Sequence, residues 1–203
     1  MNKELQNLIE KGKAEVAQDQ NHELSFKIRK EILRELGPVI NPEDIGIGKF
    51  RRANICILAV KRVLKYWEEH YTERHPHRMI AYTEKYLSGE NSRETLIAES
   101  EGFRGGLDCS DTPDKERAYL VGRASTSAAF VAVDDELLWP TAYTSEKELY
   151  DPQDHDVWDC VFWAAGAEAG GLPWMSGFDK LKYRAFWDWY LDVSIPNASL
   201  LEL

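Results

Sequence analysis

The stretch from Asp151 to Gly171, DPQDHDVWDCVFWAAGAEAGG, constrains the fold most, because its second half contains very few polar side chains. A helix built from it would carry apolar side chains around most of its circumference, which is typical of a helix buried on several sides. Asp151 and Pro152 predict the N-cap and the first helical residue, and Gly170-Gly171 predicts the end. We therefore expect the central helix of the fold here, with an acidic first turn.

Apolar residues recur at helical spacing along most of the remaining chain. The strongest pattern runs from Lys49 to Tyr71, with Arg51 and Arg52 expected off its apolar face. From Pro113 to Asp134 the inner face consists of small residues, which let a neighbouring backbone approach closely. Neither an alternating strand pattern nor an internal repeat is found. The sequence predicts an all-α fold, a single-domain bundle of about seven to eight helices.

The glycine-rich stretch 102–112 is the best place for a boundary inside this bundle. We expect one domain over residues 1–203, with an N-terminal lobe, 1–102, and a C-terminal lobe, 112–203, packed together as the alternative division. A chain of 203 residues with 43% hydrophobic residues is long enough to bury a sizeable core.

Three cysteines without CxxC spacing predict neither a disulfide framework nor a zinc site. The chain starts with a polar, charged stretch, and no segment reaches the roughly 20 apolar residues of a membrane span. We expect a soluble cytoplasmic protein that neither inserts into nor binds a membrane.

The net charge of −10 argues against nucleic acid as a partner, because phosphate binding needs clustered lysines and arginines. The charge is unevenly distributed. From Asp134 to Asp156 there are eight acidic residues and one basic residue, Lys147, which is a local net charge of −7. Such a run predicts a surface that could attract a basic partner; ordinary solvation of a loop and two helix ends is the alternative.

The candidate partner-binding residues are the acidic side chains of this run and the tryptophan within it: Asp134, Asp135, Glu136, Trp139, Glu146, Glu148, Asp151, Asp154 and Asp156. Tryptophan in an irregular segment is a frequent interface residue, although it also fills gaps between helices.

The sequence contains no recognisable catalytic or metal-binding motif. His75-Pro76-His77 matches no zinc motif, and Asp154, Asp156 and Asp159 lack the alternation and the glycine of an EF-hand. Glycine-rich phosphate loops and a nucleophile elbow are also missing. We predict a protein that is not an enzyme and that needs no metal or cofactor.

Four blocks in a fixed order resemble the fifth immunity-protein family of bacterial polymorphic toxin systems: RRANICILAVKRVLKYWEEHY with RMIAYTEKYLSGE, then GRASTSAAFVAV, VWDCVFWAAGAEAGG and RAFWDWYLDVSIP. The resemblance spans residues 25 to 196. The residues that match the family pattern are Arg51, Arg52, Trp67, Trp158 and Asp159. A buried arginine–aspartate or tryptophan network would explain them as well as a functional role, and we favour the structural interpretation.

The resemblance implies an all-α protein that protects its producer by binding a cognate toxin C-terminal domain stoichiometrically, without chemistry. Many such toxins are nucleases with basic active sites, which an acidic surface would suit. Two further hypotheses stay open. One is a small helical enzyme that uses the acidic start of the central helix, and the other is a helical scaffold for an unrelated protein partner.

Overall fold

The computed structural model describes residues 1–39, 44–107, 113–135 and 159–203, and these contain helices and no β-strand. The predicted all-α fold class is confirmed. The elements follow one another as α1 (Lys3–Gln18), α2 (Phe26–Glu35), α3 (Ile47–Val63), α4 (Lys65–Glu68), α5 (His75–Leu87), α6 (Arg93–Gly105), α7 (Pro113–Asp134), α8 (Cys160–Ala169), α9 (Lys180–Trp189), the π-helical turn η4 (Tyr190–Ser194) and α10 (Ile195–Ser199).

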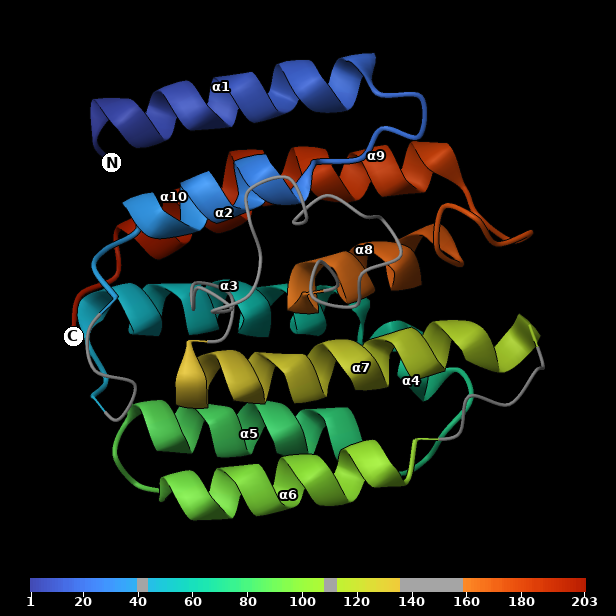
Figure 1. The fold of residues 1–203 in the computed structure, drawn as a ribbon. Helices are drawn as coiled ribbons and strands as arrows, with labels where there is room; N and C mark the ends of the chain where they lie inside the picture. Colours follow the sequence, from blue (N-terminus) through green and yellow to red (C-terminus); the bar gives the residue numbers. More distant parts are fainter. Residues whose placement is uncertain (40–43, 108–112, 136–158) are drawn as a thin grey trace, which may run out of the picture.

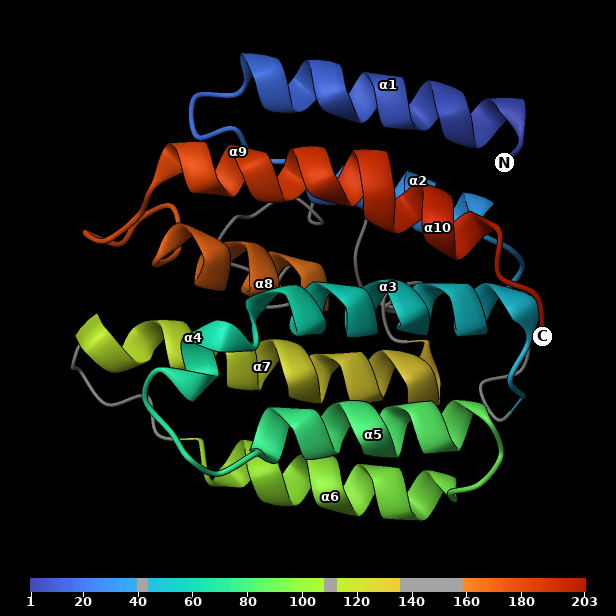
Figure 2. The same cartoon turned by 180° about the vertical axis from the view of Figure 1, so that it is seen from behind.

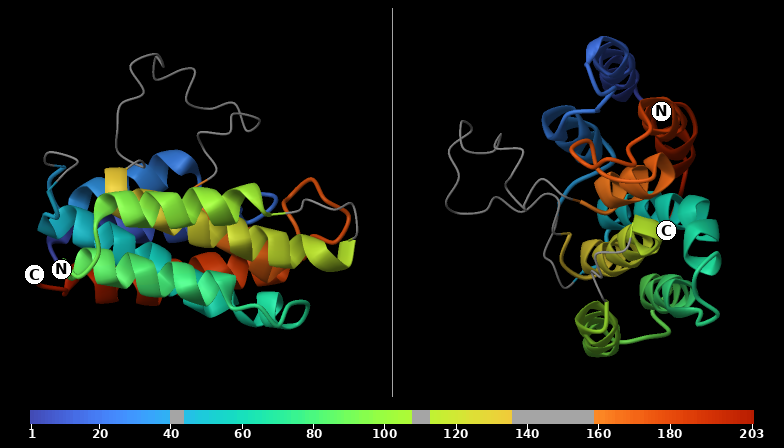
Figure 3. Two further views of the ribbon diagram at one scale, coloured as in Figure 1. Left: turned by 90° about the horizontal axis from the view of Figure 1, so that it is seen from below. Right: turned by 90° about the vertical axis from the view of Figure 1, so that its right-hand side faces the viewer.

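The long helices run along one common direction and form stacked layers (Figure 1). Helix α1 lies at one edge, followed by α2 with α9 and α10, then α3 with α8, then α7, and finally α5 and α6 at the opposite edge. The view from behind shows α9 and α10 in front of α2, with α3 below them (Figure 2). The end view shows the same order of layers (Figure 3). Both termini lie at the same end of the molecule.

Helix α7 occupies the middle of the bundle, because it packs against α3, α5, α6 and α8. Its small inner face is buried as expected, including Ala118, Ala129 and Ala132. Gly122 leaves room for the Leu107 side chain, since a Cβ there would lie 2.4 Å from one of its methyl carbons. Small residues therefore let α7 lie close to the helices around it.

Helix α8 is buried almost all round, but it is shorter than predicted. It begins at Cys160, after Asp159 with extended backbone angles, so it does not continue from Asp151. Asp151 and Pro152 lie outside the described residues. The predicted end is confirmed, because Gly170 adopts φ 85°, a left-handed conformation that glycine reaches without a Cβ penalty.

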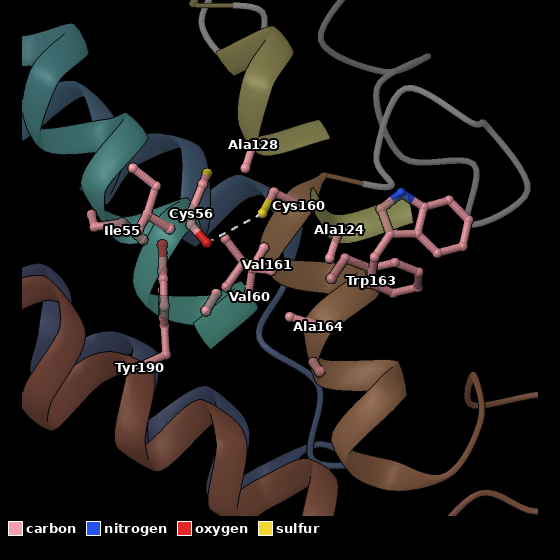
Figure 4. Close-up of a cluster of buried hydrophobic side chains, with 14 of the residues drawn as sticks. Ile55, Cys56, Val60, Ala124, Ala128, Cys160, Val161, Trp163, Ala164 and Tyr190 are labelled. Atoms are coloured by element: carbon pink, nitrogen blue, oxygen red, sulfur yellow. Dashed lines mark hydrogen bonds between the residues drawn. The ribbon is translucent and has the colours of Figure 1, made fainter. Parts of the chain in front are cut away.

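The centre of the core lies where α3, α7 and α8 meet (Figure 4). Ile55, Cys56 and Val60 of α3 face Cys160 and Val161 of α8, and all of these side chains are at most 2% exposed. The Cys160 thiol donates to the Cys56 carbonyl over 3.7 Å. Burial raises the pKa of the Cys160 thiol well above its usual value, which keeps it protonated and unreactive. One buried cluster includes side chains from both predicted lobes.

The predicted helix from Lys49 to Tyr71 is present as α3 and α4, with a break at Leu64. The expectation that Arg52 lies off the apolar face was wrong, because its side chain is fully buried, whereas that of Arg51 is half-buried.

Gly48 in the first turn of α3 lies against the backbone that follows α2. A Cβ there would lie 2.5 Å from the Pro38 carbonyl oxygen and 2.7 Å from that of Gly37. Because these atoms are backbone, we expect Gly48→Ala to lower the free energy of unfolding by about 1–3 kcal/mol in urea titrations. Gly102→Ala is the control, since a Cβ in that exposed helical position meets nothing within 4 Å. It should raise stability by about 0.5–1 kcal/mol. Equal effects of the two changes would contradict the close approach at Gly48.

Candidate functional site

The predicted acidic run is described only at its start. Asp134 and Asp135 belong to the described part of the chain, whereas Glu136, Trp139, Glu146, Glu148, Asp151, Asp154, Asp156 and Trp158 lie outside it. The residues that flank this gap, Asp135 and Asp159, are both buried. We call residues 136–158 the acidic segment.

Asp135 directly follows helix α7 and is only 2% exposed. Its carboxylate accepts two hydrogen bonds from Arg52, from Nε at 2.7 Å and from Nη2 at 2.5 Å. Its φ of 54° places it in the left-handed region, which aspartate tolerates better than most residues. The prediction that Asp135 faces a partner is therefore wrong, because its carboxylate is buried in an ion pair with Arg52.

The remaining donors of Arg52 bind the chain that follows helix α2. Nη1 donates to the carbonyls of Leu33 at 3.1 Å and Gly37 at 2.8 Å, and Nη2 donates to that of Pro38 at 3.4 Å. All five N–H groups of this guanidinium thus have acceptors. Arg52 thereby holds α2, α3 and the end of α7 together.

Two more cations lie at the C-terminal end of α7. Lys49, which is 2% exposed, donates from Nζ to the Val133 carbonyl at 3.0 Å. Arg93 pairs with Asp134 at 2.5 Å. Burial lowers the pKa of the Lys49 ammonium, and the charges of Asp134 and Asp135 oppose that shift. Acidic residues are unfavourable at a helix C-terminus, and these cations compensate for them here.

Asp159 directly follows the acidic segment, and its carboxylate makes two kinds of contact. One carboxylate oxygen caps α8 by accepting from the Phe162 amide at 2.8 Å. The other accepts a short hydrogen bond from Arg29 of α2, and both side chains of this ion pair are at most 1% exposed. Arg29 also donates to the Leu24 carbonyl at 3.2 Å and lies over the Phe162 and Trp187 rings.

Arg29 was missed by the sequence reasoning. The signal for it exists, since Ile32, Leu33 and Leu36 follow Arg29 at i+3, i+4 and i+7. An arginine in line with such an apolar face is expected to be buried and hence paired. Arg52 precedes Ile55, Cys56 and Ala59 in the same way.

Two further family-pattern residues within the described part of the chain, Arg51 and Trp67, donate to backbone carbonyls. Arg51 donates twice to Leu201 and once to Leu36, and so ties the C-terminal residues to α2 and α3. The Trp67 indole donates to the Glu73 carbonyl at 2.6 Å and stacks on Tyr71 with ring centroids 4.5 Å apart.

The segment after α8 presents Trp174, which is 56% exposed. Its ring stacks on Phe162 with a centroid distance of 6.3 Å. The described residues contain no group of three or more His, Cys, Asp or Glu side chains that could hold a metal ion. No helix among them is long and apolar enough to cross a membrane.

The model of the family described as Immunity protein Imm5 matches residues 9–197. The chain belongs to the Imm5 immunity-protein family. No curated protein matches the chain. The match extends across α2, α3, α7 and α8, so it contains both buried ion pairs and the acidic segment between them.

Removing Arg52 should destabilise this Imm5 protein strongly. Arg52→Met leaves the Asp135 carboxylate buried without a partner, and we expect a loss of about 3–5 kcal/mol in the free energy of unfolding. Arg51→Met is the matched control, because it removes a neighbouring arginine that bonds only to carbonyls. Urea titrations should show the larger loss for Arg52→Met; an equal or smaller loss would contradict the role assigned to the pair.

The carboxyl group of Glu23 should make the free energy of unfolding depend on pH. Burial raises the pKa of its carboxyl, with the Arg29 charge acting in the opposite direction. Above the ordinary value of 4.5 the folded protein therefore retains a proton that the unfolded chain has lost, so stability falls as pH rises through this window. Glu23→Gln removes this contribution. Urea titrations from pH 4.5 to 7 should show a smaller loss of stability for Glu23→Gln than for wild type, and identical pH profiles would disprove the assignment.

Proposed function

We propose that this protein binds its cognate toxin domain stoichiometrically and blocks the toxin's active site without catalysing a reaction. The family match over residues 9–197 carries this proposal. The closely packed all-α core supports it, because a preorganised binding protein loses little conformational entropy on association.

We propose further that the acidic segment supplies the contact surface. It contains six acidic side chains and one lysine, a net charge of −5. Asp135 is excluded from this surface because it is buried in its ion pair with Arg52, whereas Asp134 pairs with Arg93 but is 39% exposed and stays among the proposed contacts. The proposed contacts are Asp134, Glu136, Trp139, Glu146, Glu148, Asp151, Asp154 and Asp156. Complementary charge accelerates association with a basic surface such as a nuclease active site.

Co-expression tests the function itself. The cognate C-terminal toxin domain should arrest growth when expressed alone, and the immunity protein should restore growth and co-purify with the toxin in a fixed ratio. Loss of both rescue and co-purification would overturn the proposal. Rescue with turnover of the toxin by substoichiometric protein would instead indicate an enzyme.

Charge reversal tests the surface. Asp151→Lys, Asp154→Lys and Asp156→Lys together should slow toxin association at low salt by roughly tenfold or more and flatten its salt dependence, because electrostatic steering is lost. Kinetic binding measurements at several salt concentrations provide the readout.

The control for that experiment is Glu69→Lys, Glu73→Lys and Glu101→Lys, which changes three exposed carboxylates outside the acidic segment by the same total charge. It should alter the association rate less. Equal effects of the two triple variants would show that only the net charge matters and would rule out the acidic segment as the contact surface.

A further inference from the structure

We propose that a cavity between helices α5 and α6 is a further contact site for the toxin domain, and that it receives an acidic side chain of the toxin. The proposal rests on the proposed function. The residues that carry it come from α5, from α6 and from Trp67 of α4, and all of them belong to the described part of the chain.

The cavity lies in the outermost layer of the bundle, where α5 and α6 run side by side at one edge (Figure 2). Its volume is about 300 Å³, which is at the lower end of the range for ligand pockets. The described residues that line it are His75, Arg78 and Met79 of α5 and Ala98, Glu99, Gly102 and Phe103 of α6. A cavity of this size at the surface can accept a side chain of a partner protein.

One wall of the cavity is made of aromatic rings. Phe103 stacks on His75 with ring centroids 5.1 Å apart. The buried Trp67 contacts both rings edge to face, at 6.4 Å from His75 and 5.6 Å from Phe103. Its indole is held by the hydrogen bond to the Glu73 carbonyl. Trp67 thus fixes this wall from the inside, which makes a family-pattern residue a positioning residue for the cavity.

The polar groups of the cavity favour a negatively charged occupant. Arg78 binds Glu99 through Nη2 at 3.1 Å, which leaves its Nε and Nη1 donors available within the described chain. The His75 imidazole makes ring contacts but no hydrogen bond to a described residue. Because Glu99 is already paired, the groups that still seek a partner are chiefly donors.

A carboxylate would accept charge-assisted hydrogen bonds from the Arg78 guanidinium, and the carbon chain that carries it would lie against Phe103 and Met79. A basic side chain would instead meet the positive charge of Arg78. Charge complementarity therefore selects an acidic side chain as the occupant.

Filling the cavity tests the site. Gly102 lines it, and a Cβ at Gly102 meets nothing within 4 Å, so Gly102→Leu places a side chain there without displacing the backbone. Gly105→Leu is the matched control, because Gly105 is an exposed glycine of the same helix whose Cβ also meets nothing within 4 Å. Both full-length variants should keep the wild-type helical circular dichroism. Gly102→Leu should bind the toxin domain at least roughly tenfold more weakly and Gly105→Leu with wild-type affinity; equal affinity of the two variants would overturn the proposal.

A second pair of variants tests the charge of the occupant. Arg78→Gln removes the cation of the cavity and should weaken toxin binding by roughly tenfold. Lys61→Gln is its control, because Lys61 forms a similarly exposed ion pair with Glu84 at 2.7 Å outside the cavity, and it should bind as wild type does. Weaker binding of Gly102→Leu together with wild-type affinity of Arg78→Gln would indicate an uncharged or basic occupant and would overturn the assignment of an acidic side chain. If wild type itself does not bind the toxin domain, the proposed function fails, which is a distinguishable result.

Discussion

The guanidinium of Arg52 joins parts of the chain that are far apart in the sequence. Five hydrogen bonds link α3 to the end of α2, to Gly37 and Pro38, and to Asp135, 83 residues away. Removing a buried charge from water is costly unless every donor finds an acceptor. Because this arginine satisfies all of its donors, the buried ion pair is compatible with a stable core and specifies how α2, α3 and α7 meet.

The second pair, Arg29 with Asp159, repeats this arrangement at α8. Together the two ion pairs connect four helices of the core. Small and apolar residues of α3, α7 and α8 form a closely packed core, and Asp135 and Asp159, the two residues that flank the acidic segment, are both buried in ion pairs with it. The two pairs thus fix how α2, α3, α7 and α8 of this Imm5 protein meet.

Local patterns in the sequence predicted most of the fold. The helices of residues 1–36 and 49–71, the small face of α7 and the glycine end of α8 all follow from periodicity and capping. The start of α8 was misplaced, because Asp151-Pro152 resembles a helix start in the sequence, whereas Asp159 is the N-cap of α8. Asp135 was misassigned because an acidic run gives no sign that one member pairs with a buried arginine. Arg29 and Asp159 are 130 residues apart, so no local pattern links them.

A double-mutant cycle on Arg52 and Asp135 measures the central interaction most directly. The free energy of unfolding is determined in urea for wild type, Arg52→Met, Asp135→Asn and the double variant. We predict that the double variant is about as stable as the weaker single variant or more stable, with a coupling energy of roughly 2 kcal/mol or more, because the second change removes a group left unpaired by the first. Strictly additive losses would show that the two side chains contribute independently and would contradict the account.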